Sequence, residues 1–304
     1  MTEPPPIPLT VIGGWLGAGK TTLLNRILAT AHERIAVVVN DIGEINVDAA
    51  LLRQGPNSTD DEIIELTNGC VCCSIGDSLA LTLRDLTMRT PAPDRIIVEA
   101  SGVADPAQVA EFGDRRRVPL DAIITLAEVD GFERKSTTPP YGGLMLAQVS
   151  GADLVIATKL DLVSSEDRPA GLAHLRSRTS APVIETADDP DWIRNVILGP
   201  HEPTDRTHYE PTGAETPVAT RTWRPTGPVD LEEIEQALRR PGMLRAKGSV
   251  TTPHGAALVH LAGDRVTITD LADRDPLDAI VLIAESHDAV NEVAAALTTT
   301  HLGG

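Results

Sequence analysis

The chain has 304 residues, with 44 Asp and Glu against 26 Lys and Arg and a formal net charge of −18. At about 150 residues per domain, this length predicts two domains. The apolar content of 41% argues against a disordered or fibrous protein, and the acidic balance argues against nucleic-acid binding, which needs clustered Lys and Arg. No apolar run reaches the roughly 18 residues of a membrane span, and the N-terminus lacks signal-peptide features. We therefore expect a cytoplasmic protein without a membrane segment.

Residues 7 to about 190 alternate short apolar runs with helical stretches. Continuous β-branched runs separated by helices indicate a parallel sheet covered on both faces. We expect an α/β domain over residues 7–198 with a doubly wound, mostly parallel sheet, whose ligands lie beyond the carboxyl ends of the strands. The expected strands are 9–13, 35–40, 62–66, 95–99, 122–126, 154–158 and 182–185, and the helices between them include 21–31, 78–88 and 107–112.

A glycine-rich loop follows the first expected strand. Its sequence, Gly-Trp-Leu-Gly-Ala-Gly-Lys-Thr, fits the P-loop pattern G-x-x-x-x-G-K-[ST] in the required context of strand, loop and helix. Glycines let backbone N–H groups converge on phosphate oxygens, and the helix N-terminus adds partial positive charge. We expect Lys20 to reach the β- and γ-phosphates and the Thr21 hydroxyl to bind Mg²⁺; the alternative is a glycine turn before a helix. The predicted nucleotide-binding residues of this loop are Gly14, Gly17, Ala18, Gly19, Lys20, Thr21 and Thr22.

All three cysteines lie within four residues, at Cys70, Cys72 and Cys73. An odd, clustered set cannot form a disulfide framework, and in a cytosolic chain it indicates metal or redox chemistry. Thiolates suit Zn²⁺, Co²⁺ or Cu⁺, and three of them leave one tetrahedral position for another ligand. Two alternatives remain, namely three small buried residues under a loop and a redox relay.

An acidic residue ends the fourth expected strand. At this point Glu99 can hold Mg²⁺ directly or through water, and the N–H of Gly102 can sense a γ-phosphate. No glutamine is evident for positioning the attacking water, so we expect slow intrinsic hydrolysis.

The sixth expected strand leads into Thr158-Lys159-Leu160-Asp161, which resembles the N-K-x-D guanine motif of GTPases. Asp161 can accept from N1–H and the 2-amino group of guanine, whereas adenine presents an unprotonated N1 there; such pairing is a strong source of discrimination. The Lys159 stem can cover the base. Thr158 stands where Asn is usual, which predicts a changed contact at this position.

The stretch 199–217 is rich in Pro, Gly and polar residues and predicts an interdomain linker. Residues 218–304 then predict a small α+β domain. Its expected helices are 231–239 and 288–297, and its expected strands are 244–251, 256–261, 265–269 and 279–284.

The whole set of motifs resembles the CobW-type family of P-loop GTPases, which are regarded as metallochaperones or metal-insertion factors. Residues 40–44, Asn-Asp-Ile-Gly-Glu, are similar to the family's switch I segment N-E-F-G-E, with Asp41 in place of its first Glu. Residues 69–73 carry the family's G-C-x-C-C metal motif, and residues 99–106 match the segment after its Walker B strand. Residues 245–248, Arg-Ala-Lys-Gly, look like the R-A-K-G signature of its C-terminal domain.

Two departures from the family pattern concern metal storage and the client. Where the family often has a histidine-rich stretch, the linker offers only His201 and His208. No client-docking motif is evident before Ile7, so the sequence does not indicate the client.

The resemblance implies a GTP-hydrolysing metallochaperone that binds Zn²⁺, or else Co²⁺, at the three cysteines and delivers it to a client metalloprotein. The second domain is the expected surface for the client or for a homodimer. Two alternatives stay open: a P-loop ATPase or kinase with a structural zinc, and a non-catalytic metal buffer. The implied catalytic set is Lys20, Thr21, Glu99 and Asp41, with Thr21 and Glu99 on Mg²⁺ and Asp41 or Glu44 as the candidate fourth ligand of the transition metal.

Overall fold

The computed structural model describes residues 5–39, 63–65, 74–113, 116–201, 218–262, 265–271, 276 and 278–298. The described residues up to His201 form one compact unit, and those from Val218 onward form a second. Within this described part of the chain, no helix combines the length and the apolar character needed to span a membrane.

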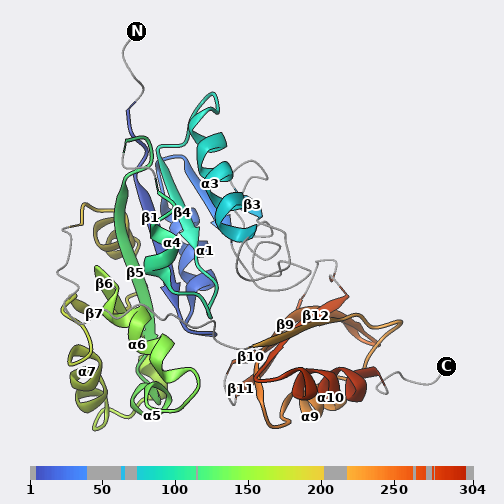
Figure 1. The fold of residues 1–304 in the computed structure, drawn as a ribbon. Helices are drawn as coiled ribbons and strands as arrows, with labels where there is room; N and C mark the ends of the chain where they lie inside the picture. The colour runs from blue at the N-terminus through green and yellow to red at the C-terminus, as the bar shows by residue number, and fades with distance from the viewer. Residues whose placement is uncertain are drawn as a thin grey trace. The chain divides into compact units, whose positions relative to one another are not determined.

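The first unit is built on a fully parallel sheet, in which seven of the described strands follow the order β3-β2-β4-β1-β5-β6-β7 (Figure 1). Strand β1 lies in the middle, and the sheet grows from it in both directions, which confirms the expected doubly wound architecture. The crevice beside the carboxyl end of such a central strand is where these sheets bind ligands. The strands are β1 Leu9–Gly14, β2 Ile35–Val39, β3 Ile63–Glu65, β4 Arg95–Glu99, β5 Leu120–Glu128, β6 Leu154–Thr158 and β7 Val183–Glu185.

Successive residues of the central strands pack into two separate cores, because side chains alternate between the faces of a sheet. Ile12 belongs to a core closed by α1 and the π-turn η2, whereas Val11 belongs to a core closed by α3 and α4. A third cluster joins α5, α6 and α7 to β5 and β6. The helical elements are α1 Lys20–Thr30, α3 Ser74–Thr87, α4 Pro106–Ala110, α5 Phe132–Ser136, α6 Gly142–Ser150, η1 Leu160–Leu162, α7 Arg168–Arg176, α8 Pro190–Trp192 and η2 Ile193–Ile197.

Strand β5 is longer than the apolar run 122–126 predicts, because polar residues at both ends continue the ladder. Asp121 accepts a bond from Arg95, and Glu128 accepts bonds from two lysines. A search for apolar runs omits such positions, since their burial depends on partners that are distant in sequence.

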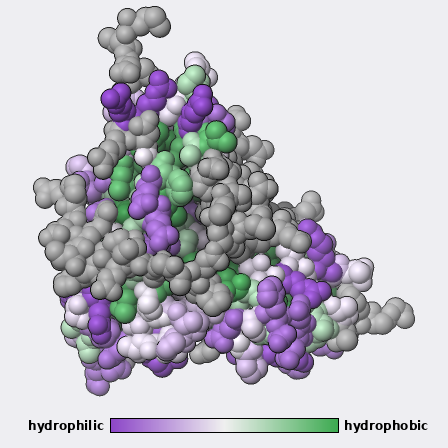
Figure 2. Space-filling view, viewed as in Figure 1, coloured by the Kyte–Doolittle hydropathy of each residue, from purple (hydrophilic) through white to green (hydrophobic). Residues whose placement is uncertain are grey.

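The second unit is a five-stranded antiparallel sheet among the described residues, in the order β11-β10-β9-β12-β8. Apolar residues of α9 and α10 pack with it into one core, and the outer surface of these helices is mostly hydrophilic (Figure 2). Strand β8 was not predicted because only its first and last residues, Ala219 and Trp223, are apolar and buried. The elements are β8 Ala219–Trp223, α9 Leu231–Leu238, β9 Met243–Thr252, β10 Gly255–Ala262, β11 Arg265–Asp270, β12 Ala279–Ala284 and α10 His287–Thr298.

Candidate nucleotide-binding site

The glycine-rich loop runs from the carboxyl end of β1 to the first residue of α1. Gly14, Gly17 and Gly19 have φ angles of 130°, 80° and 104°, which residues with a Cβ rarely adopt. A Cβ on Gly14 would also lie 2.2 Å from the carbonyl oxygen of Leu126 on β5. The loop therefore packs closely against the carboxyl ends of β1 and β5 and leads to the N-terminus of α1. There, backbone N–H groups and the helix dipole favour an anion.

Lys20 is the first residue of α1 and is only 5% exposed. Its Nζ donates to the carbonyl oxygen of Gly14 at 2.7 Å and to that of Trp15 at 3.3 Å. A buried ammonium is stable only where hydrogen-bond partners replace water, and these two carbonyls provide them. The ammonium is thus held across the loop that the sequence predicts to surround the phosphates.

Thr21 and Glu99 come together although they are distant in sequence. The Thr21 hydroxyl donates to Glu99 Oε1 at 3.4 Å, and Glu99 is 3% exposed at the end of β4. Parallel pairing with β1 sets Glu99 beside Ile12, just before the loop. A hydroxyl and a carboxylate are the hard oxygen donors that suit Mg²⁺, which usually takes its other ligands from phosphates and water. This donor pair therefore fits the predicted Mg²⁺.

The turn after β4 lies against the loop. A Cβ on Gly102 would stand 2.9 Å from the backbone nitrogen of Leu16, so glycine permits this close approach. The same turn is held from α6 by Gln148, whose Nε2 donates to the carbonyl oxygens of Gly102 at 3.1 Å and Ala104 at 2.8 Å. Gln148 is 1% exposed, so its amide acts as a fixed brace for the turn that carries the predicted γ-phosphate sensor.

The predicted base motif follows β6. Thr158 Oγ1 donates to the carbonyl oxygen of Ala18 at 3.0 Å, so the threonine ties the base motif to the phosphate loop. Lys159 has φ 55° and ψ 39°, a left-handed conformation that costs a residue with a Cβ about 1–2 kcal/mol. Asp161 follows in the 3₁₀ turn η1 and is exposed.

Glu128, at the end of β5, is the charged partner of that lysine. Its Oε2 lies 2.5 Å from Lys159 Nζ, and its Oε1 accepts from Lys135 Nζ on α5. Burial acts to raise the pKa of Glu128, but the charges and hydrogen bonds of the two lysines outweigh it and hold that pKa below its ordinary value. The carboxylate therefore stays ionised although its side chain is 6% exposed.

Further contacts around the site are not part of any sequence motif and were not predicted. Arg26 of α1 donates to the carbonyl of Ala187 and lies 3.3 Å from Asp188, which ties α1 to the segment after β7. The rings of Trp15 and Tyr141 are 5.2 Å apart, which joins the phosphate loop to the start of α6. For Gln148, the signal in the sequence is an amide within an otherwise apolar helix; for Arg26 we find none.

The other predicted site residues lie outside the described part of the chain. These are Asp41 and Glu44 of the switch-like segment and the three cysteines, Cys70, Cys72 and Cys73. Among the residues that are described, no three His, Cys, Asp or Glu side chains gather as a metal site. Of the remaining predicted residues, Ala18 lies buried within the loop and Thr22 is exposed on the first turn of α1.

The central strand, the glycine loop and the Lys20, Thr21 and Glu99 side chains define a P-loop nucleotide-binding protein. A family profile described as "CobW/HypB/UreG, nucleotide-binding domain" matches residues 8–184, and one described as "Cobalamin synthesis protein cobW C-terminal domain" matches residues 218–300. The first of these matches spans more than half of the chain. The chain belongs to the CobW/HypB/UreG family, as the motifs in its sequence predict.

Three relatives illustrate the match. A zinc chaperone CobW from Pseudomonas aeruginosa is 30% identical over an alignment of 295 positions, gaps included, which covers 81% of this chain and 77% of the relative. A zinc chaperone CobW from Sinorhizobium sp is 33% identical over an alignment of 223 positions, gaps included, which covers 64% of this chain and 62% of the relative. Zinc-regulated GTPase metalloprotein activator 1 from Dictyostelium discoideum is 26% identical over an alignment of 340 positions, gaps included, which covers 89% of this chain and 70% of the relative. The match to the Sinorhizobium protein thus spans less than two thirds of its length.

Proposed function

We propose that the protein is a cytoplasmic, GTP-hydrolysing metallochaperone that carries Zn²⁺, or else Co²⁺, on Cys70, Cys72 and Cys73. In this proposal it delivers the ion to a client metalloprotein in step with its nucleotide state. The second unit is the proposed surface for the client or for a second copy of the chain. Relatives named zinc chaperone and zinc-regulated GTPase support zinc and GTP as the two ligands.

One observation carries the proposal, and it concerns three neighbouring strands. Strands β3, β2 and β4 are parallel, and their last residues, Glu65, Val39 and Glu99, are register partners. Adjacent strands lie about 4.8 Å apart, so the chain leaves the sheet at three points side by side. In the sequence, these exits lead to the cysteine motif, to the segment of Asp41 and Glu44, and to the turn of Gly102. The segments predicted to bind the metal and the nucleotide therefore begin side by side at the carboxyl ends of these three strands.

Each predicted nucleotide-binding residue at the carboxyl ends of the strands has a proposed role in GTP binding or hydrolysis. Lys20 neutralises the β- and γ-phosphates, and Thr21 and Glu99 hold Mg²⁺, which supplies further charge neutralisation when it is bound. Gly102 offers its N–H to the γ-phosphate, and Asp161 accepts from the guanine edge. The sequence offers no evident glutamine to position the attacking water, so we expect slow intrinsic hydrolysis.

Order in the segments around the γ-phosphate is the proposed link to the metal. In GTPases, contacts with the γ-phosphate and Mg²⁺ order switch segments, and hydrolysis releases them. Ordering of these segments would fix the three thiolates and a fourth ligand, Asp41 or Glu44, around the ion. Hydrolysis would loosen the set and allow transfer to the client.

The first test is nucleotide choice, measured as hydrolysis of GTP and ATP by the wild type and the Asp161→Ala variant. We expect a GTP preference in the wild type that the variant loses. A P-loop ATPase or kinase with a structural zinc predicts ATP preference that Asp161→Ala leaves unchanged. A metal buffer predicts no hydrolysis of either nucleotide with any metal or partner.

A further inference from the structure

Glu128 is a buried carboxylate gripped by two lysines from different elements. It ends β5, it pairs in register with Thr158 of β6, and its side chain is 6% exposed. Lys135 reaches it from α5, and Lys159 reaches it from the base motif at 2.5 Å. A buried carboxylate needs a compensating cation. Lys135 alone supplies one, so the contact with Lys159 calls for a further explanation.

The backbone around Lys159 is fixed on both sides. The N–H of Val129 donates to the carbonyl of Thr158 at 3.1 Å, and the N–H of Leu162 donates to the carbonyl of Lys159 at 3.1 Å. A residue with a Cβ keeps a left-handed conformation only where its surroundings hold it. These two bonds hold the main chain, and the contact with Glu128 holds the side chain. The turn that leads to Asp161 is therefore braced from β5.

We propose that Glu128 is a positioning residue for guanine recognition, which fixes Lys159 so that the turn presents Asp161 to the base. This role rests on the guanine-nucleotide function proposed above. Glu128 acts through Lys159 and need not touch the nucleotide itself. The Lys159 stem then lies in one direction in every nucleotide state, ready to cover the base.

The charge arrangement supports this role over a purely structural one. A buried ion pair adds little net stability compared with apolar residues of the same size. A pair whose only task is to fill the core therefore has no need of a cation from the base motif. The lowered pKa of Glu128 keeps the contact charged at neutral pH, so it persists under working conditions.

The test compares GDP and ADP affinity in the full chain for the wild type, Glu128→Gln, Lys159→Met, the double variant and Lys135→Met. We expect Glu128→Gln to weaken GDP about tenfold, the loss of one charge-assisted bond, while ADP affinity stays within about twofold. In the Lys159→Met background the same change should have no further effect, because its route of action is gone. Lys135→Met is the matched control and should keep GDP affinity, since it leaves the contact with Lys159 intact.

Three outcomes contradict the inference. One is GDP and ADP affinities that both stay unchanged in folded Glu128→Gln protein, another is an equal loss of both affinities, and the third is full additivity with Lys159→Met. Thermal unfolding checks the fold of each variant, and Glu128→Asp, which keeps the charge, should recover part of the preference if Glu128→Gln is unstable. A wild-type protein without guanine preference overturns the proposed function itself, which separates the two failures.

Discussion

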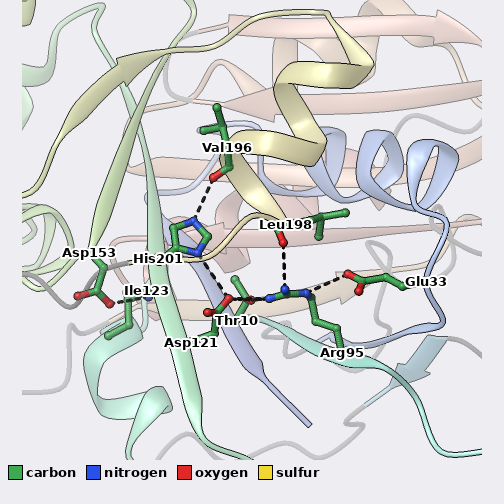
Figure 3. A network of polar contacts seen from close by, with 9 residues as sticks. All are labelled: Thr10, Glu33, Arg95, Asp121, Ile123, Asp153, Val196, Leu198 and His201. Atoms are coloured by element: carbon green, nitrogen blue, oxygen red, sulfur yellow. Dashed lines mark hydrogen bonds and ion pairs between the residues drawn. The ribbon is translucent and has the colours of Figure 1, made fainter.

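The two ends of the parallel sheet treat charged side chains differently. At the amino ends of the strands, Arg95 is 9% exposed and is enclosed by fixed partners (Figure 3). It bonds Glu33 at 3.0 Å, Thr10 at 3.0 Å, Asp121 at 2.6 Å and the carbonyl of Leu198 at 3.0 Å. This end joins β1, β4 and β5 to the stretch after η2, so its polar groups hold the unit together.

At the carboxyl ends, the charged groups bond to loops and turns. Lys20 donates to two carbonyls of its own loop, and Thr21 donates to Glu99. Such contacts can be exchanged for phosphate oxygens or Mg²⁺ without breaking the core. The difference teaches that burial and charge alone do not mark a ligand-binding group; what marks it is whether its partners can be replaced by a ligand.

Loss of Arg95 is the largest change that we expect. Arg95→Met leaves the half-buried Asp121 without its arginine partner, and removal of one partner from a fully buried pair costs about 3–5 kcal/mol of unfolding free energy, which is the upper limit here. Urea denaturation of the full chain measures this loss. Arg34→Met, at the exposed pair with Asp94, is the matched control and should cost far less. If folded Arg95→Met protein lost as much binding free energy for GDP as unfolding free energy, Arg95 would also serve the nucleotide site. The functional distinction between the two ends of the sheet would then be wrong.

Loss of Lys20 should show the opposite pattern. Lys20→Ala removes the ammonium that meets the developing phosphate charge, so we expect kcat/KM for GTP to fall by about 100-fold or more. The unfolding free energy should fall far less than in Arg95→Met, because the two loop carbonyls that lose the ammonium carry no net charge. Steady-state hydrolysis and urea denaturation of the same preparation measure both quantities. A normal rate with a large loss of stability would mean that Lys20 is structural.

Gln148 tests the brace beneath the Gly102 turn. Gln148→Leu keeps the size but leaves two carbonyls without their donor, which costs about 1–3 kcal/mol. If the turn senses the γ-phosphate, affinity for a non-hydrolysable GTP analogue should fall more than GDP affinity. Gln236→Leu, on the exposed side of α9, is the control and should change neither affinity. Equal loss of both nucleotides would reduce Gln148 to a packing role.

The smallest expected effect is a pH dependence of stability at the amino end. His201 Nδ1 lies 3.5 Å from Asp121, and its Nε2 contacts the carbonyl of Val196. The hydrogen bond to Asp121 raises the pKa of His201 despite burial and the charge of Arg95. Burial opposes the change at Asp121, but its bonds to His201 and Arg95 lower the pKa of that carboxyl.

The two pKa shifts make the unfolding free energy depend on pH in opposite directions. The contribution of His201 is full below its unfolded pKa near 6.5 and is lost as pH rises through the raised folded value. The contribution of Asp121 is full above 3.8 and is lost as pH falls through its lowered value. Urea denaturation from pH 4 to 8.5 should therefore show stability declining on the alkaline side in the wild type and less so in His201→Asn. An identical decline in both proteins would contradict the assignment.

Local pattern was sufficient to predict the sheet, because every strand of the first unit contains an apolar β-branched run. It was also sufficient for the phosphate loop, since glycine spacing fixes the backbone there. It did not predict the braces at Gln148 and Glu128, whose partners are 7 to 46 residues away and belong to other elements. His201 was expected in the linker, and in the structure it packs against Asp121. Sequence pattern did not predict this contact because Asp121 lies 80 residues earlier in the chain.

The central claim is that nucleotide state and metal affinity are coupled. The most direct measurement is a competition titration of Zn²⁺ and Co²⁺ into reduced protein with a non-hydrolysable GTP analogue, with GDP and without nucleotide. We predict a much tighter metal site with the GTP analogue, which Cys72→Ala abolishes, and an equal tightening of the analogue by metal, as linkage requires. Equal metal affinity in all three nucleotide states would contradict the account.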